Sequence, residues 1–437
     1  MPSKIQTPPT DRRMLVEAVA ASTIGTTIEW YDFFLYGLAA GDVFPALFFP
    51  TADRFSALMA SFATFAVGFL ARPIGGALFG YLGDRVGRKS TLVATLLLMG
   101  VSTLLVGFLP TYAHIGVAAP IILTLLRIVQ GIGVGGEWGG AVLLALEYGH
   151  RGRRGFYASW PQAGVPLGLL SSSGVVWLCE VLVGREAFVD WGWRIPFFVS
   201  GLLIAVGLLI RLRILETPLF RQLQESQRVA ASPLIEVLWR HWRDVLLAAG
   251  TRFGENACFY LFGIYVITFG REVLNVEHRL MLMAVNLAAA LEFCAIPLYG
   301  LLSDRWSRRR AYALGCIVLA VIALPYFALL DTREPGWIVL AVVVSLAGAH
   351  GLLYSVQASL IPELFGTQVR YSGASLGYQL AAPLAGGPAP MIAATLVHTL
   401  PGRTWPLALY IISMSLISLG CVTALAETSR RDISGPN

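Results

Sequence analysis

The 437-residue sequence has little charge: aspartate, glutamate, lysine and arginine together make up only 13% of it, against roughly 25% in a typical soluble protein. Hydrophobic residues make up 56%, and the mean hydropathy is +0.68. A water-exposed surface needs far more charge than this. The composition therefore excludes a soluble globular protein and a disordered chain, and it predicts a protein with many membrane spans.

Cysteine is also scarce. The five cysteines lie in apolar stretches and form no CxxC pair, so neither a disulfide framework nor a zinc site is expected. The sequence has no G-x-x-x-x-G-K-[ST] phosphate-binding loop and no Ser/His/Asp or metal-ligand cluster. We therefore expect no enzyme activity, no ATP-driven transport, no cofactor and no metal. Gly131-x-Gly133-x-x-Gly136 matches a dinucleotide fingerprint, but inside an apolar run close helix packing explains these glycines better.

Roughly 20 apolar residues cross a bilayer as a helix, and the chain offers twelve such stretches. Their long apolar runs lack the strict alternation of a β-barrel. The sequence thus predicts an all-α membrane protein of twelve helices. The predicted spans are 15–40, 55–82, 90–109, 116–147, 155–183, 194–214, 244–271, 280–303, 311–330, 336–361, 371–399 and 404–426.

Lys4 and Lys89 are the only lysines among the 32 basic residues, and most of the basic residues fall in the loops on one side of the twelve spans. Cytoplasmic loops carry such an excess, so both termini are expected in the cytoplasm. The polar N-terminus is followed by no cleavage site, which indicates a retained tail and not a signal peptide. The charge pattern reports topology, and no nucleic-acid partner is expected.

The chain repeats itself after the sixth span. The segments 80–89 and 300–309 both read G-x-L-x-D-R-x-[GS]-R-[KR], and further matching residues recur at nearly the same offset. This predicts a six-helix bundle over residues 1–214, a cytoplasmic linker over 215–243 and a second six-helix bundle over 244–437.

The repeated residues predict a conformational motif. Its aspartates can accept hydrogen bonds from the N–H groups at a helix N-terminus, and its arginines can pair with acids at neighbouring helix ends. Links that form in one global state and break in another make a bistable element. The predicted members are Gly80, Asp84, Arg85, Gly87, Arg88, Asp304, Arg305, Arg308, Glu147, Arg154, Glu363 and Arg370.

At this point the sequence resembles the major facilitator superfamily, through the duplicated loop motif, the six-plus-six layout and Arg127-x-x-Gln130-Gly131-x-Gly133. The segments 29–37, 71–76, 135–137 and 369–378 resemble its metabolite:proton symporter family. The resemblance covers essentially the whole chain. It implies a transporter of the bacterial inner membrane that carries a carboxylate, proline or betaine together with protons. Ser307 departs from the usual glycine of the second loop motif, which favours a structural role for that copy.

Ionisable side chains inside spans are costly and by default functional. Asp32 and Arg127 fall at similar depth, at about 1.5 Å per residue, and we expect them to pair, as the family resemblance also implies. A substrate anion that takes Arg127 would then favour protonation of Asp32, linking the two events. A purely structural ion pair is the alternative, and Glu29 is an alternative proton site. Glu137 is either a proton relay or a structural partner of Arg72.

On the seventh span Arg252 is expected either to pair with Glu255 or to anchor a carboxylate. His350, Tyr354 and Gln357 share one face of the tenth span, which favours substrate contact. Glu292 has no visible partner. The predicted proton-coupling residues are Asp32, Glu29 and Glu137, and the predicted substrate-binding residues are Arg127, Gln130, Tyr31, Tyr36, Gln162, Arg252, Asn256, His350, Tyr354, Gln357 and Gln379.

These features predict a secondary active transporter that imports a small organic acid with protons by alternating access. It would act as a monomer in the lipid bilayer, with the organic anion and protons as its partners. The alternatives are a symporter of a zwitterionic osmolyte or of an acidic sugar such as sialic acid, and a non-transporting membrane sensor. The chain ends soon after the twelfth span, which speaks against the osmolyte alternative, because osmosensing members often carry a long C-terminal extension.

Overall fold

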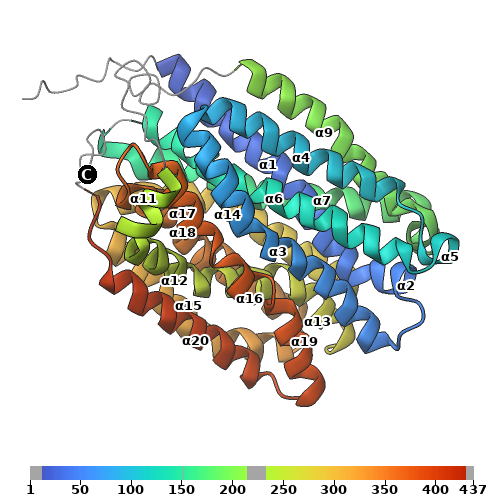
Figure 1. Ribbon diagram of the computed structural model, residues 1–437. Coiled ribbons are helices and arrows are strands. Elements are labelled where there is room, and N and C mark those ends of the chain that lie inside the picture. The colour runs from blue at the N-terminus through green and yellow to red at the C-terminus, as the bar shows by residue number, and fades with distance from the viewer. Residues whose placement is uncertain (1–11, 150, 214–232, 430–437) are drawn as a thin grey trace, which may run out of the picture.

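The computed structural model describes residues 12–149, 151–213 and 233–429, and all the regular structure among them is helical (Figure 1). We call residues 12–213 the first half and residues 233–429 the second half. The first half contains α1 (Arg12–Asp42), α2 (Phe44–Phe48), α3 (Arg54–Arg85), α4 (Arg88–Phe108), α5 (Tyr112–Ile115), α6 (Ala118–Tyr148), η1 (Arg151–Arg153), α7 (Arg154–Val183), α8 (Arg185–Ala187), η2 (Phe188–Gly192) and α9 (Arg194–Arg213).

The second half has more and shorter elements. It contains α11 (Pro233–Arg240), α12 (Trp242–Phe259), η3 (Tyr260–Tyr265), α13 (Val266–Glu272), α14 (His278–Arg305), α15 (Arg308–Asp331), α16 (Pro335–Val343), η4 (Val344–His350), α17 (Gly351–Leu360), η5 (Pro362–Leu364), α18 (Arg370–Gln379), η6 (Ala382–Gly386), α19 (Ala389–Thr399) and α20 (Trp405–Ala424).

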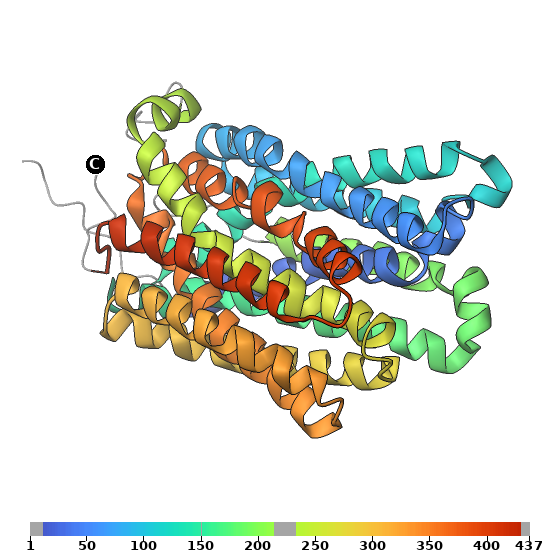
Figure 2. The same ribbon diagram turned by 90° about the horizontal axis from the view of Figure 1, so that it is seen from below.

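Each of the twelve predicted spans corresponds to one helix or to a string of helices. Ten described stretches are long and apolar enough to cross a membrane. The other two spans are α1 and the α12–η3–α13 string, which carry ionisable residues in their interior. Of the predicted linker, residues 215–232 lie outside the described part, and the rest carries α11 and the start of α12. Both views show the long helices running side by side between two ends of the molecule (Figures 1 and 2).

The two halves meet mainly through two helix pairs, α7 with α14 and α3 with α18. The helices α3 and α14 finish at the end that holds Asp84 and Asp304, on the left of Figure 1. We call it the Asp84 end, and the opposite end, where α1 finishes, the Asp42 end. At the Asp42 end α3 begins after Asp53, whose carboxylate accepts from the N–H of Phe55 at 3.0 Å and of Ser56 at 3.2 Å, as an N-cap does.

Glycines bring α3 and α6 into direct backbone contact. A Cβ atom on Gly75 would collide with the carbonyl of Ile132, and one on Gly131 would collide with the carbonyl of Gly68. The glycine run of the fourth span therefore serves close helix packing, as the sequence predicted.

The central helices of the second half are interrupted by π-helical segments, which are frequent at functional sites. η3 follows α12, η4 separates α16 from α17, and η6 separates α18 from α19. In the first half, α1, α6 and α7 occupy the corresponding places in the repeat and run as unbroken helices of 30 or 31 residues. The repeat therefore holds for helix order but not for local backbone structure.

Candidate functional site

The first loop motif ties the two halves together at the Asp84 end. The Asp84 carboxylate accepts hydrogen bonds from the backbone N–H of Tyr371 at 3.3 Å, and from the N–H and hydroxyl of Ser372 at 2.9 and 2.7 Å. Both residues lie in the first turn of α18, in the other half of the chain. These are the hydrogen bonds expected of an aspartate at a helix N-terminus.

The second loop motif makes the same tie in the opposite direction. The Asp304 carboxylate accepts from the N–H of Gly155 at 2.8 Å and of Phe156 at 2.9 Å, in the first turn of α7. Arg308 pairs with Asp304 at 2.8 Å and with Glu363 at 3.4 Å. Each half thus caps a helix of the other half with an aspartate.

The remaining motif residues divide into buried and exposed ones. Arg370 pairs with Glu147 across the halves at 3.3 Å, and Arg154 is buried. Arg85 and Arg305 are exposed, and Arg85 donates to the hydroxyl of Tyr81 one turn earlier. The side chain of Arg88 lies outside the described part of the structure.

The structure explains both Gly80 and the departure at Ser307. Gly80 faces Ser372 of α18, whose Cα would lie 3.1 Å from a Cβ on Gly80. Gly87 has a φ of 130°, which favours glycine, but Ser307 has a φ of −175°, which any residue adopts. The Ser307 hydroxyl accepts from the N–H of Arg310 at 3.2 Å and donates to Glu427. At this position the second copy of the motif makes a structural contact.

Arg127 lies in the middle of α6 and has no acidic partner among the described residues. Its side chain is 0% exposed, and its guanidinium carbon lies 4.1, 4.3 and 4.7 Å from the ring centroids of Phe33, Tyr36 and Phe65. One nitrogen, Nη1, donates to Gln130. Nε and Nη2 lack a hydrogen-bond partner in the described part of the chain. Cation–π contact offsets only part of the cost of burying this charge.

The expected pair of Asp32 with Arg127 is not formed in this conformation. No ion pair or hydrogen bond joins the two side chains in the described part of the structure. Gln130 contacts both residues, since it accepts from Arg127 and its Nε2 lies 3.5 Å from the backbone oxygen of Asp32. Asp32 is 1% exposed, and its Oδ1 has no partner among the described residues.

Glu137 pairs with Arg211 and not with Arg72, which corrects the structural alternative for this residue. Both guanidinium Nη atoms of Arg211 contact the carboxylate, one at 2.9 Å, and the hydroxyl of Thr95 donates to it at 2.7 Å. In the sequence Arg211 stands near the end of a predicted span and resembles a loop cation, but in the structure it is buried. Glu137 is therefore a charge-balanced residue in this conformation.

Arg72 is a second buried cation, and it is not among the predicted substrate-binding residues. Its guanidinium carbon lies 4.2 Å from the ring centroid of Phe33 and 4.3 Å from that of Phe69. Its Nε and Nη2 lack hydrogen-bond partners among the described residues, and Tyr260 of the second half lies beside it. The signal was present in the sequence, because Arg72 stands in a span with no acid one turn away.

Glu29 is another buried acid of the first half that lies near the candidate site. It is 4% exposed, and its Oε2 has no partner among the described residues. Its charged neighbours include Glu137 and Arg211. The cations near Glu29 are Arg211, which Glu137 already holds, and Arg72.

Buried charges in the second half contact one another. Arg252 pairs with Glu255 at 3.1 Å, as the local alternative predicted. Its guanidinium also donates to Gln357 at 3.3 Å and to the backbone oxygen of Tyr378, over whose ring it lies at 3.2 Å. Asn256 donates to Glu255 at 3.0 Å. Arg252 and Asn256 are therefore engaged within the protein.

His350 links two glutamates from different helices. Its Nδ1 lies 2.5 Å from Oε1 of Glu292, and its Nε2 lies 3.4 Å from Oε1 of Glu255. The ring stacks on Tyr354 with centroids 5.0 Å apart. Sequence reasoning groups His350 with substrate contacts and leaves Glu292 unpaired, because spacing along one helix cannot reveal a partner on another.

Two of the glutamines and two of the tyrosines predicted to bind substrate make structural contacts here. Gln162 donates to the backbone oxygen of Tyr354 at 2.9 Å, and Gln379 donates to that of Gly135 at 3.2 Å, so both bridge the halves. The hydroxyl of Tyr31 donates to the backbone oxygen of Pro196, and that of Tyr36 to Thr64, each at 2.8 Å. Tyr36 also lies against Arg127.

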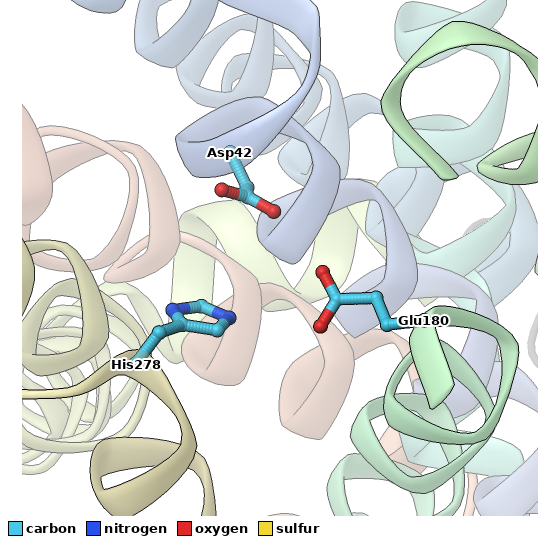
Figure 3. Close-up of side chains that lie close together, drawn as sticks. All are labelled: Asp42, Glu180 and His278. Carbon is cyan, nitrogen blue, oxygen red and sulfur yellow. The ribbon is translucent and has the colours of Figure 1, made fainter. Parts of the chain in front are cut away.

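The Asp42 end is also closed by contacts between the halves. Arg271 pairs with Asp42, and Arg54 pairs with Glu272 at 2.5 Å. Asp42, Glu180 and His278 converge here (Figure 3), with one potential ligand atom of each within 4.8 Å of the others. Arg185 already bridges Asp42 and Glu180, so an ion-pair cluster accounts for this convergence. A cavity of about 790 Å³ opens beside it.

Comparisons with known proteins give one consistent result. Residues 23–390 match the model of the Major Facilitator Superfamily. The chain is 38% identical over 415 residues to the shikimate transporter of Escherichia coli strain K12, covering 94% of this chain and 95% of that protein. It is 35% identical to the proline/betaine transporter of Salmonella typhimurium, covering 97% and 86% of the two chains.

A solved structure supports the fold. The proton:xylose symporter XylE bound to 6-bromo-6-deoxy-D-glucose superposes with a TM-score of 0.78, covering 97% of this chain and 98% of that one, at 17% sequence identity. At this identity the likeness concerns the arrangement of helices only.

Proposed function

Because this chain belongs to the Major Facilitator Superfamily and is a secondary transporter of metabolites, we propose that it imports a small organic acid together with protons. Membership of this family shows that the chain is an integral membrane protein that handles a small molecule. It is not an enzyme. The finer proposal, an organic anion driven by protons, rests on the buried charges of the first half.

The proposal depends on the two unsatisfied guanidinium nitrogens of Arg127. A buried guanidinium with two unsatisfied nitrogens costs free energy unless an anion or another acceptor reaches it. Nε and Nη2 lie on one edge of the guanidinium, the arrangement that binds a carboxylate through two parallel hydrogen bonds. No acid of the described residues occupies that edge. A transported carboxylate would supply the missing acceptors.

Asp32 and Glu29 are the proposed proton-coupling residues. Each is buried and keeps one oxygen without a hydrogen-bond partner among the described residues. A buried carboxylate with an unsatisfied oxygen is costly when ionised, so binding a proton lowers that cost. Gln130 contacts both Arg127 and the backbone of Asp32, which gives ligand binding at Arg127 a direct mechanical link to the acid.

Transport proceeds in this proposal by rocking of two six-helix bundles, which we assign to residues 1–214 and 244–437, about the linker between them. The caps made by Asp84 and Asp304 hold the Asp84 end closed, and the pairs Asp42–Arg271 and Arg54–Glu272 hold the other end closed. Alternate breaking of these two sets opens the site to one side at a time. We place the Asp84 end and both termini in the cytoplasm of a bacterial cell, the protein in its inner membrane, and one chain as the working unit.

The proposal is tested by ligand binding to purified protein. Wild type, Arg127→Ala and Arg127→Lys are compared with Arg194→Ala as the matched control, because Arg194 is a peripheral arginine that also lies over an aromatic ring, 4.4 Å from that of Trp193. The melting temperature in detergent is measured with three classes of added ligand. These are carboxylates, including shikimate, their neutral amides, and the zwitterions proline and betaine.

We expect wild type and Arg194→Ala to prefer the acid to its amide, and Arg127→Ala to lose this preference by about 100-fold or more, because hydrogen bonds to charged groups contribute ~1.5–3 kcal/mol each. Arg127→Lys should also bind weakly, since an ammonium cannot make the two parallel bonds. If wild type prefers the amides, the organic-acid proposal is wrong. If only the zwitterions bind, an osmolyte is the substrate.

A further inference from the structure

The buried histidine of the second half is surrounded by more negative than positive charge. His350 is 1% exposed and Glu292 is 0% exposed, and the imidazole lies between the carboxylates of Glu292 and Glu255 at 2.5 and 3.4 Å. Arg252 balances Glu255. Glu292 has no cation beside it in the described part of the chain except His350 in its protonated form.

Charge balance therefore depends on one proton. With His350 protonated, two cations face two carboxylates, and the buried group is neutral overall. With His350 neutral, one negative charge remains buried. The other titratable groups that interact with these glutamates are neutral at pH 7: one thiol, Cys258, and the phenols of Tyr260, Tyr299, Tyr312, Tyr354 and Tyr378.

Glu292 is not fully satisfied by the surrounding protein. Its second oxygen, Oε2, is buried and has no hydrogen-bond partner among the described residues. A carboxylate that served packing alone would be expected to have both oxygens hydrogen-bonded, because a buried acceptor without a donor costs free energy. The orphaned oxygen therefore favours a role in which this acid exchanges partners or protons.

The backbone around the histidine is also irregular. The π-helical segment η4 ends at His350 itself, and the π-helical segment η3 begins at Tyr260, one turn beyond Glu255 on the same string of helices. His350 and Glu255 thus lie at or near π-helical distortions, which occur frequently at functional sites. This observation is independent of the charges.

We propose that His350, held between Glu292 and Glu255, is a second proton-binding site in the second half of the transporter. This inference rests on the proposed proton-coupled transport and adds a site to it. The proton resides on the imidazole, shared with Glu292 through the short Nδ1 contact. It leaves when the halves open, because the closed conformation buries the whole cluster.

The contacts around Glu255 connect this site to the interface between the halves. Glu255 is shared by His350 and Arg252. Arg252 lies over the ring of Tyr378, and that ring stacks on Trp138 of the first half with centroids 3.7 Å apart. Loss of the proton leaves Glu255 paired with Arg252 alone, and Arg252 holds the ring that contacts the other half.

The test is a titration of the full-length purified protein labelled with ¹⁵N-histidine, followed by NMR across the pH range in which an imidazole between two carboxylates should titrate. The chain has six histidines, and His350→Gln assigns the signal by removing it. We expect the His350 imidazole to bind and release a proton within this range. Glu292→Gln should lower its midpoint by about one pH unit or more, because a carboxylate in contact favours the imidazolium.

Two variants serve as controls. Glu292→Asp keeps the charge, so the pH midpoint of His350 should stay close to its wild-type value. Asp244→Asn removes the acid that lies 3.6 Å from His241 at the start of α12, and it should leave the His350 midpoint unchanged. If Glu292→Gln does not fold, Glu255→Gln decides in its place, since Glu255 contacts the other ring nitrogen.

The inference is overturned if His350 keeps one protonation state throughout the range, or if removing either glutamate leaves its midpoint unchanged. This titration needs no transported ligand. A failure here is therefore distinguishable from failure of the proposed function, which appears in the Arg127 binding experiment.

Discussion

The two halves of the molecule share a sequence repeat but treat their buried charges differently. In the first half, Arg127 and Asp32 both keep polar atoms without partners among the described residues. In the second half, Arg252 contacts Glu255, and His350 contacts both Glu255 and Glu292. Glu292 also keeps one oxygen without such a partner. In our proposal, a transported anion satisfies Arg127 of the first half, and a proton on His350 balances the acids of the second half.

The loops, in contrast, retain their symmetry. Asp84 and Asp304 each cap a helix of the opposite half, α18 and α7. These caps need only an acid at a helix end, so both copies of the repeat can make them. The central residues differ because, in our proposal, the first half binds the ligand at Arg127 and the second half binds a proton at His350.

The largest expected effect is a difference in protein stability between Arg252→Ala and Arg127→Ala. Arg252→Ala removes one partner of a buried pair and should destabilise the protein by about 3–5 kcal/mol. Arg127→Ala removes a cation that has no acid beside it in the described structure, so it should leave stability unchanged or raise it. Melting temperatures of the two variants without ligand check this contrast, and equal losses would contradict it.

The next effect concerns coupling in the first half. Asp32→Asn mimics the protonated acid, so it should abolish accumulation of substrate against its gradient while leaving counterflow in proteoliposomes intact. The measurement is uptake of the acid that binds best to wild type, with and without an imposed pH gradient. Wild-type accumulation by the variant would remove Asp32 from the mechanism and leave Glu29 as the candidate.

The two loop aspartates should both give a smaller effect. Asp84→Asn and Asp304→Asn keep an oxygen acceptor but lose the charge, and charged hydrogen bonds are roughly twice as strong as neutral ones. We expect about tenfold slower transport, with ligand affinity within about twofold of wild type, because the closed end and not the site is weakened. A loss of affinity equal to the loss of rate would assign these residues to the binding site.

The smallest effect concerns the carboxylate that Ser307 contacts. Burial opposes ionisation of Glu427, but hydrogen bonds from the Ser307 hydroxyl and from the N–H groups of Ser429, Arg308 and Arg309 lower its pKa to about 2. A lowered pKa contributes stability above the unfolded value near 4.5, and this contribution is lost as the pH falls toward about 2.

Glu427 is exposed, so solvent screening keeps the contribution below about 1 kcal/mol. Glu427→Gln should lower the melting temperature slightly at neutral pH, and the difference from wild type should vanish as the pH falls toward the pKa of about 2. The same small shift at both pH values would show that the carboxylate charge does not matter.

Much of the fold follows from the sequence, for physical reasons. Apolar runs of bilayer length locate the spans, and a duplicated loop motif locates the helix caps made by Asp84 and Asp304. Both signals are local, so the motif predicts an aspartate that can cap a helix but not which helix it caps. The structure shows that each aspartate caps a helix of the other half.

The pairing of central charges does not follow in the same way. Counting residues gives the depth of Asp32 and Arg127 but not the rotation of each helix about its axis, and rotation decides whether the side chains meet. The Glu137–Arg211 pair is hidden because a span boundary is uncertain by a few residues. His350 contacts Glu292 on another helix, where no spacing rule applies.

The central claim is that the free edge of Arg127 binds the transported anion. The most direct measurement is an experimental structure of the wild-type protein with the acid that raises its melting temperature most. We predict a carboxylate of that ligand within about 3 Å of both Nε and Nη2 of Arg127. A ligand bound elsewhere, with those two nitrogens still lacking an acceptor, would contradict it.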